Sequence, residues 1–175
     1  AAGLLLALST AAATDAAEAP TPAAQTIPSA AKTLKLDLGE GISLELMEIP
    51  AGEHGMLNRK FTFKHPFYLG KYEVTQEQYQ VLMKANPSAA KNLKGPVENL
   101  TWKDALEFCG RLKEKCGKPV RLPLEVEWEY ACAARSKTTY YNGNNVEDLK
   151  KIAWCASHPP ADLHPQAVGG LEANP

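Results

Sequence analysis

Cysteine and histidine are the side chains in this sequence most able to do redox or metal chemistry, and the chain of 175 residues holds four of each. A cysteine reacts as its thiolate, which a neighbouring cation favours. Cys109 and Cys116 lie on one expected helix, about 10 Å apart along its axis, which is too far for a direct disulfide. No cysteine has a histidine or lysine in a convincing activating arrangement. The sequence therefore predicts no catalytic residue within this chain.

Two histidines and three glutamates could be taken for ligand clusters. His158 and His164 flank a proline-containing loop, but no third ligand at a fitting spacing accompanies them, so we expect no metal site. Glu125, Glu127 and Glu129 fall on a helix, where alternate residues point about 200° apart and cannot converge. We expect one of them to cap the helix or form an ion pair and the others to face solvent.

The elements that must position these residues begin with short strands. Residues 34–38 and 42–46 alternate apolar and polar side chains, as in half-buried strands, and Gly39 and Gly41 favour a hairpin turn between them. Residues 61–63 and 67–69 are further short strand candidates. The first half of the chain therefore predicts a small antiparallel sheet.

Two helices follow, and a threonine N-cap predicts the start of each. Thr75 with Gln78 forms a capping box, and Tyr79, Leu82 and Met83 share one face of the helix that Thr75 begins. Thr101 begins the second helix, with Asp104 as its capping partner, and a glycine after Cys116 ends it. The expected buried stripe of this second helix comprises Trp102, Ala105, Leu106, Cys109, Leu112 and Cys116.

A third helix is expected from about Glu125 to Arg135, with Trp128, Ala131 and Cys132 facing the core. Its cap position holds Leu124, which has no side-chain oxygen to accept a hydrogen bond from the first-turn amides. After Lys137 we expect loops, because turn-forming residues dominate there. Strands followed by helices and coil indicate the α+β class.

The overall composition excludes several classes of function. The net charge is −1 and the isoelectric point is near 6.5, so the chain lacks the basic surface typical of nucleic-acid binding. No apolar run approaches the roughly 20 residues that a transmembrane helix needs. We expect neither a nucleic-acid partner nor a transmembrane span.

The N-terminus has the pattern of an export signal. A short apolar run at residues 4–8 precedes small residues, which is typical of the end of a signal peptide; the alternative is an alanine-rich leader without a targeting role. We assign residues 1–13 to a signal-peptide remnant, 14–33 to an Ala/Pro-rich linker and 34–175 to the folded domain. Residues 1–32 are expected to be disordered or removed, and the protein to be exported to the periplasm, the envelope or the medium.

Four motifs occur in a recognisable order. They are I-P-A-G at 49–52, F-Y-L-G-K-Y-E-V-T at 67–75, V-E-N-L-T-W-K-D-A at 97–105 and R-L-P-L-E-V-E-W-E-Y-A at 121–131. Together they resemble the formylglycine-generating enzyme, or sulfatase-modifying-factor, family, whose hallmark reads R-L-P-T-E-A-E-W-E-Y-A. Leu124 and Val126 depart from that hallmark.

The resemblance implies a C-type-lectin-like α+β fold with little regular structure. It also implies that Trp128 anchors the third helix in the core and that Arg121 pairs with a nearby carboxylate or with loop carbonyls. Glu127 and Trp102 are further structural residues of the motifs. The family's later G-L-Y-D-M-x-G-N-V-x-E-W signature and its reactive cysteine pair do not occur in this chain. We therefore expect residues 34–175 to be the N-terminal part of such a domain, truncated before its catalytic centre and the strands that close its sheet.

Cys109 and Cys132 fall where some members of this family carry cysteines that pair with the later half of the domain. The resemblance makes them candidate half-cystines; the alternative is that both are small buried apolar residues. On the truncated chain we expect the apolar faces of the first two helices, including Tyr79, Trp102 and Leu112, to stay uncovered.

Three functions are compatible with the resemblance. The intact protein could oxidise a cysteine of a sulfatase-type substrate to formylglycine, in which case copper is the implied cofactor. Alternatively it is a non-catalytic exported module that binds a ligand or protein on the same fold, or a structural domain of an envelope complex. Family membership alone does not choose between these functions.

Overall fold

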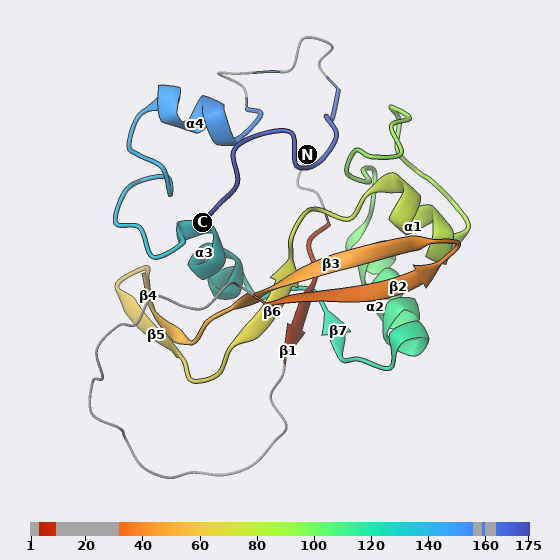
Figure 1. The fold of residues 1–175 in the computed structure, drawn as a ribbon, viewed down its shortest axis with the longest axis horizontal. Coiled ribbons are helices and arrows are strands. Elements are labelled where there is room, and N and C mark those ends of the chain that lie inside the picture. The colour runs from red at the N-terminus through yellow and green to blue at the C-terminus, as the bar shows by residue number, and fades with distance from the viewer. Residues whose placement is uncertain (1–3, 10–31, 156–158, 160–163) are drawn as a thin grey trace.

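The computed structural model describes residues 4–9, 32–155, 159 and 164–175. Five strands form one antiparallel sheet in the order β2-β3-β6-β1-β7, and two more form a separate hairpin (Figure 1). The sheet strands are β1 (Ala7–Ser9), β2 (Thr33–Gly39), β3 (Ile42–Ile49), β6 (Phe67–Gly70) and β7 (Val120–Arg121); the hairpin strands are β4 (Gly52–Met56) and β5 (Arg59–Phe63).

The β2–β3 hairpin forms where alternation predicted it. Leu36, Leu38, Leu44 and Leu46 are at most 4% exposed, so the apolar positions of both strands share the buried face. The turn passes through Gly39 and Gly41 at φ +88° and +74°, values that glycine adopts without a side-chain clash. Predicted strands at residues 61–63 and 67–69 are confirmed as parts of β5 and β6.

Helices α1 (Gln76–Met83) and α2 (Trp102–Cys116) cover the leucine face of this hairpin (Figure 1). Both predicted capping boxes are present, and Gly117 ends α2 in the left-handed conformation. The rings of Tyr79 and Phe108 stack with centroids 5.4 Å apart, which joins the two helices. Tyr79 is 4% exposed and Leu112 is fully buried, so the prediction that they stay uncovered is wrong for these two residues, whereas Trp102, the third residue of that prediction, is 70% exposed.

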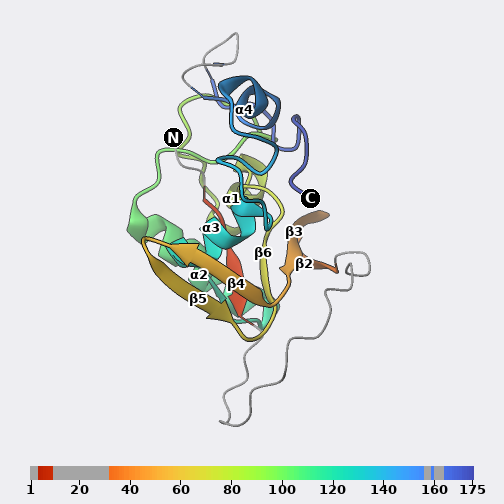
Figure 2. The ribbon, with the colours of Figure 1, turned by 90° about the vertical axis from the view of Figure 1, so that its left-hand side faces the viewer.

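A second, smaller core lies around Tyr130 of α3 (Glu125–Ala133). Its ring stacks on Phe63 with centroids 4.6 Å apart, and its hydroxyl donates to the Pro50 carbonyl at 3.1 Å. A Cβ added at Gly52 would meet the Tyr130 hydroxyl oxygen at 2.3 Å, so only glycine allows β4 to pass so close. Figure 2 shows the β4–β5 hairpin in front of α3 and the last helix, α4 (Val146–Ile152), beyond it at the top.

The inward faces of α2 and α3 differ from the prediction. On α2, Trp102 is 70% and Leu106 48% exposed, while Phe108, which the predicted stripe lacked, is fully buried. On α3, Trp128 is 48% exposed and Cys132 is exposed. Glu127 and Tyr130, with Ala131 partly buried, form the inward face instead, and Trp128 and Cys132 lie about 100° or more around the helix from it.

The N-terminal segment also differs from the prediction. Leu4, Leu6, Ala7 and Leu8 are at most 7% exposed and form or flank a strand in the interior of the sheet. The prediction of disorder is therefore wrong for residues 4–9, because an apolar run of this length is also what a strand buried on both faces requires. The prediction for residues 10–31 lies outside the described residues. In the described part of the chain, no helix is long and apolar enough to cross a membrane.

Candidate functional site

Arg121 forms an ion pair with a carboxylate, which is one of the two kinds of partner that the resemblance implied, and this carboxylate belongs to Glu127. The two guanidinium nitrogens Nη2 and Nη1 lie 2.6 Å and 2.7 Å from Oε1 and Oε2 of Glu127, a bidentate geometry that binds more strongly than a single contact. Arg121 Nη1 also donates to the Leu122 carbonyl at 3.0 Å, and the Leu124 N–H donates to Glu127 Oε2 at 2.8 Å. The carboxylate thus fastens the first turn of α3 to β7.

The charge state of this pair follows from its surroundings. Burial alone would raise the pKa of Glu127, whose side chain is 8% exposed. The hydrogen bonds from Arg121 and the Leu124 amide outweigh burial and hold the pKa of Glu127 below its ordinary value. The hydrogen bonds that Arg121 donates to Glu127 raise the pKa of the guanidinium group in turn. Both groups stay charged near neutral pH, and their role is to position α3.

The four cysteines do not come together into a reactive pair. Cys109 is 5% exposed, and burial raises the pKa of its thiol to about 11. Although Cys132 is exposed overall, the protein atoms around its sulfur and the Glu129 carboxylate raise its pKa. Cys109, Cys116 and Cys132 are thiols in the structure. A raised pKa disfavours the thiolate, so Cys109 and Cys132 are poor nucleophiles as they stand.

The histidines are the other candidate metal ligands of the sequence. In the described part of the chain, no three His, Cys, Asp or Glu side chains lie close enough together to hold a metal ion. His158 lies outside the described residues, and His164 is exposed. His54, which the sequence analysis did not single out, lies 3.5 Å from Glu129 through Nε2.

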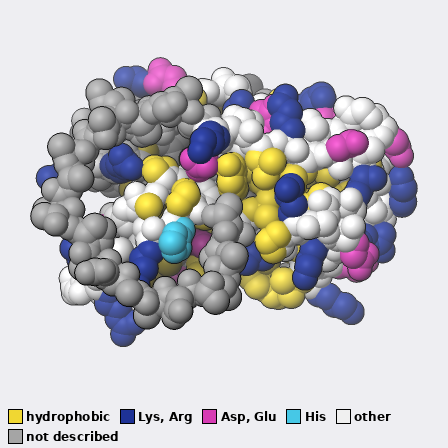
Figure 3. All heavy atoms as spheres, turned by 60° about the horizontal axis from the view of Figure 1, so that its bottom comes forward, with side chains coloured by type: hydrophobic (Ala, Val, Ile, Leu, Met, Phe, Trp, Pro, Cys, Tyr) yellow, Lys and Arg dark blue, Asp and Glu magenta, His cyan; other side chains and the backbone are white. Residues whose placement is uncertain are grey.

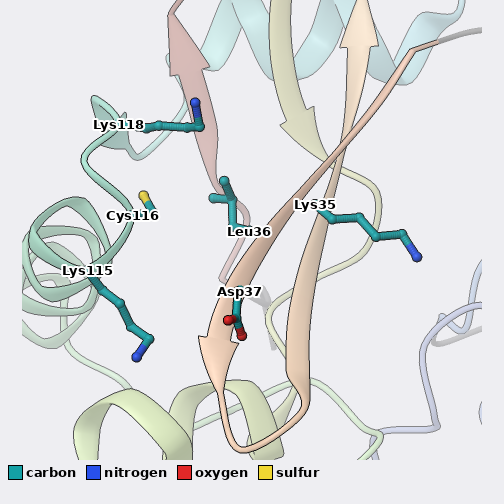
Figure 4. A pocket seen from close by; sticks show the side chains of 6 residues that line it. All are labelled: Lys35, Leu36, Asp37, Lys115, Cys116 and Lys118. Carbon is teal, nitrogen blue, oxygen red and sulfur yellow. The ribbon is translucent and has the colours of Figure 1, made fainter.

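A hollow of about 340 Å³ lies between β2 and the end of α2 (Figure 4). Lys35, Leu36, Asp37, Lys115, Cys116 and Lys118 line it. Lys35 points away from Lys115 and Lys118, and its ammonium group lies 2.7 Å from Glu45 on the neighbouring strand. Lys115 and Lys118 are long exposed side chains, and Asp37 accepts from the Gly39 N–H at 2.8 Å. Two exposed ammonium groups beside a carboxylate do not make a selective anion site.

Two exposed apolar pairs are the most distinctive surface feature. Trp102 and Leu106 on α2 are 70% and 48% exposed, and Leu124 and Trp128 at the start of α3 are 61% and 48% exposed. The i, i+4 spacing makes Trp102 and Leu106 neighbours on one face of α2, whereas Leu124 is the N-cap residue that precedes α3 and Trp128 lies in the first turns of that helix. We call these four residues the helix surface. Sequence periodicity assigned Trp102, Leu106 and Trp128 to helices but placed all three on buried faces.

Hydrophobic side chains reach the surface elsewhere as well. Figure 3 shows them gathered in the middle of the face at the bottom of Figure 1, with lysine, arginine, aspartate and glutamate around them. Leu57, in the turn between β4 and β5, is 84% exposed and Trp154 is 43% exposed. Leu57 and Trp154 are single exposed apolar residues, which are common on proteins, whereas the helix surface combines four of them on two elements.

Comparison of the sequence with known proteins assigns the chain to a family. The family described as "Sulfatase-modifying factor enzyme 1-like domain" matches residues 40–175. The chain is also 35% identical to the protein named "Chaperone protein LppX" of Paenibacillus barcinonensis, with 50% of this chain and 43% of that protein covered. The chain thus spans less than half the length of this relative. No solved structure matches. Over most of its length, from residue 40 onward, the chain belongs to the sulfatase-modifying-factor family.

Proposed function

We propose that this chain is part of an exported, non-catalytic protein-binding module that holds apolar stretches of a partner polypeptide on the helix surface. The observation that carries the proposal is the exposure of four large apolar side chains, Trp102 and Leu106 on α2 and Leu124 and Trp128 at the start of α3. Tryptophan is enriched among the residues that dominate protein–protein binding energy. A C-type-lectin-like arrangement of the complete domain, as the resemblance implies, is part of this proposal.

The helices present these side chains on a rigid support. Capping boxes and Gly117 fix both ends of α2, and Phe108 and Leu112 hold it to the sheet without exposure. Glu127 and Tyr130, on the buried face of α3, hold this helix to the rest of the fold through their hydrogen bonds to Arg121 and Pro50. A rigid support lowers the entropic cost of binding, because fewer groups are ordered when the partner arrives.

The relative from Paenibacillus barcinonensis supports this choice of function. Its printed name describes a chaperone, a class of protein that holds other polypeptides. Apolar side chains at the surface are what such a protein needs, since unfolded chains expose apolar segments.

Formylglycine generation is the second candidate, and family membership is the observation that favours it. The intact protein would then oxidise a substrate cysteine with oxygen, through a copper-binding cysteine pair outside this chain. Cys109 and Cys132, with their raised pKa values, do not suit that role. Incubating the chain with copper, oxygen and a peptide bearing a sulfatase-type cysteine motif should leave the peptide unmodified. Aldehyde above a no-protein control would favour the oxidase.

An aggregation assay tests the binding proposal. Reduced insulin, whose B chain aggregates, is mixed with the chain and light scattering is followed. Suppression by the wild type and its loss in the double variant Trp102→Gln, Trp128→Gln is the expected result. Trp154→Gln is the matched control, because Trp154 and Trp128 are 43% and 48% exposed. Equal suppression by the double variant and the wild type would contradict the proposal.

A further inference from the structure

The α2 part and the α3 part of the helix surface differ in the charges that surround them. On α2, the charged residues beside the two exposed apolar side chains balance one another. Lys103 is followed directly by Asp104, and Oε1 of Glu107 lies 2.7 Å from Nη2 of Arg111. These four charges cancel, so the α2 part favours neither a cation nor an anion in a bound segment.

On α3, the charge beside the exposed apolar side chains is negative. Glu125 is exposed, and the side chain of Glu129 is 40% exposed. The two carboxylates are spaced i, i+4, and Trp128 follows Glu125 at i+3, so all three side chains are neighbours on the helix. The third carboxylate of this helix start, Glu127, is neutralised by Arg121. Glu125 and Glu129 therefore form an acidic rim beside Trp128.

The charges of this acidic rim are not neutralised within the described part of the chain. No lysine or arginine there forms an ion pair with Glu125, and Glu129 lies 3.5 Å from His54, which is charged only when it is protonated. Besides burial, the charge of Glu129 raises the pKa of Cys132, one turn further along α3. Because like charges at i, i+4 repel each other on a helix, a cation that a partner brings to the rim would relieve this repulsion.

We propose that the helix surface selects apolar segments that carry lysine or arginine beside their apolar residues, and that Glu125 and Glu129 determine this selectivity. Leu124 and Trp128 contact the apolar part of the segment, and its cation lies at the acidic rim, where the ring of Trp128 attracts it further. This inference rests on the function proposed above and adds the class of segment that the surface accepts. The two glutamates are not a binding site of their own; complementary charge acts mainly on the choice between partners.

The test compares two fluorescent peptides that have the same apolar residues, one flanked by lysines and the other by glutamates. Binding to the full chain is followed by fluorescence anisotropy at low and at high ionic strength. At low ionic strength, we expect the lysine peptide to bind about tenfold more tightly than the glutamate peptide. This preference should shrink at high ionic strength, because salt screens exposed charges. A preference that salt leaves unchanged would contradict its assignment to the acidic rim.

Two double variants separate the acidic rim from the net charge of the molecule. Glu125→Gln with Glu129→Gln keeps the apolar contacts and should bind the two peptides with similar affinity. Glu40→Gln with Glu114→Gln is the matched control, because it removes the same amount of charge at two exposed carboxylates. Glu40 lies in the β2–β3 turn, and Glu114 lies more than two turns of α2 beyond Leu106. The control should keep the preference of the wild type, and an equal loss in both variants would overturn the proposal.

The same titrations separate a failure of the selectivity from a failure of the binding function. If the wild type binds both peptides equally, the helix surface holds apolar segments without regard to charge, and only the selectivity is refuted. If the wild type binds neither peptide, the binding function fails and the selectivity fails with it. If the variant without Glu125 and Glu129 still prefers the lysine peptide as strongly as the wild type does, these two carboxylates do not determine the choice of segment.

Discussion

Helices α2 and α3 both carry exposed apolar side chains, but the start of each helix is stabilised in a different way. In α2 the support is local: Thr101 accepts from the Asp104 N–H, Asp104 accepts from the Thr101 N–H, and Gly117 closes the helix. In α3 the support is tertiary, because Leu124 offers no cap and the carboxylate of Glu127 reaches back to Arg121 on β7. A helix without a side-chain cap can therefore still be held in place by one buried ion pair, but its stability then depends on that pair.

The largest loss of stability is expected from removing the ion pair between Arg121 and Glu127. Glu127→Ala leaves the Arg121 guanidinium and the Leu124 amide without their shared partner. Because the Arg121 side chain is 36% exposed, we expect a loss of about 2–3 kcal/mol, below the usual range for a fully buried pair. Urea denaturation measures it. Glu107→Ala, which breaks the exposed Glu107–Arg111 pair on α2, is the control and should cost no more than about 0.5 kcal/mol. Equal losses from the two variants would show that the α3 pair is not a special support.

The same pair predicts a dependence on pH. The pKa of Glu127 is lowered in the folded state, so its stabilisation is present above the ordinary value of 4.5 and is lost as the pH falls through the lowered folded value. The difference in unfolding free energy between the wild type and Glu127→Gln should therefore shrink between pH 7 and pH 3. Denaturation midpoints at the two pH values test this. A difference that stays constant would mean that the charge of Glu127 contributes nothing.

Removing the local support of α2 should have a smaller effect. Thr101→Ala deletes the oxygen that accepts from the Asp104 amide at 3.2 Å. Loss of a threonine cap costs about 1 kcal/mol. Thr101→Ser, which keeps the hydroxyl, should retain most of the stability in the same urea titration. If Ser and Ala destabilise alike, the cap is not what holds α2.

The smallest effect is expected from giving α3 the cap that α2 has. Leu124→Thr would place a hydroxyl where the first-turn amides need an acceptor, and Leu124 is 61% exposed, so little buried area is lost. We expect a gain of up to about 1 kcal/mol, the ordinary value of a cap. Thermal denaturation should show a higher midpoint. A lower midpoint would show that Leu124 contributes packing that its exposure does not reveal.

The contrast between α2 and α3 also explains how far the sequence predicted the fold. Wherever the signal was local, the prediction was confirmed: the capping boxes at Thr75 and Thr101 and the alternation of β2 and β3. The face of α3 was predicted wrongly because Glu127 turns inward only through Arg121, a tertiary partner. A local signal for α4 existed in Asn145 and Asp148, which have the spacing of a capping box, and the surrounding turn residues obscured it.

Long-range pairing accounts for the remaining differences. Residues 4–8 have the composition of an export signal, and only β6 and β7, far along the chain, make them a strand. Strand β7, of two residues, is too short for any periodicity to show. The family was recognised because its motif at 121–131 is specific, whereas nothing local separates an apolar residue in the core from one in the helix surface.

Direct binding of an unfolded polypeptide tests the central claim, that the helix surface holds apolar segments of a partner. Fluorescently labelled insulin B chain is titrated with the wild type, with the double variant Leu106→Gln, Leu124→Gln and with Leu57→Gln, where the same change is made at an 84% exposed leucine in the β4–β5 turn. We predict that the double variant binds at least tenfold more weakly and that Leu57→Gln binds like the wild type. Equal affinities for all three proteins, or an equal loss in Leu57→Gln, would contradict the account.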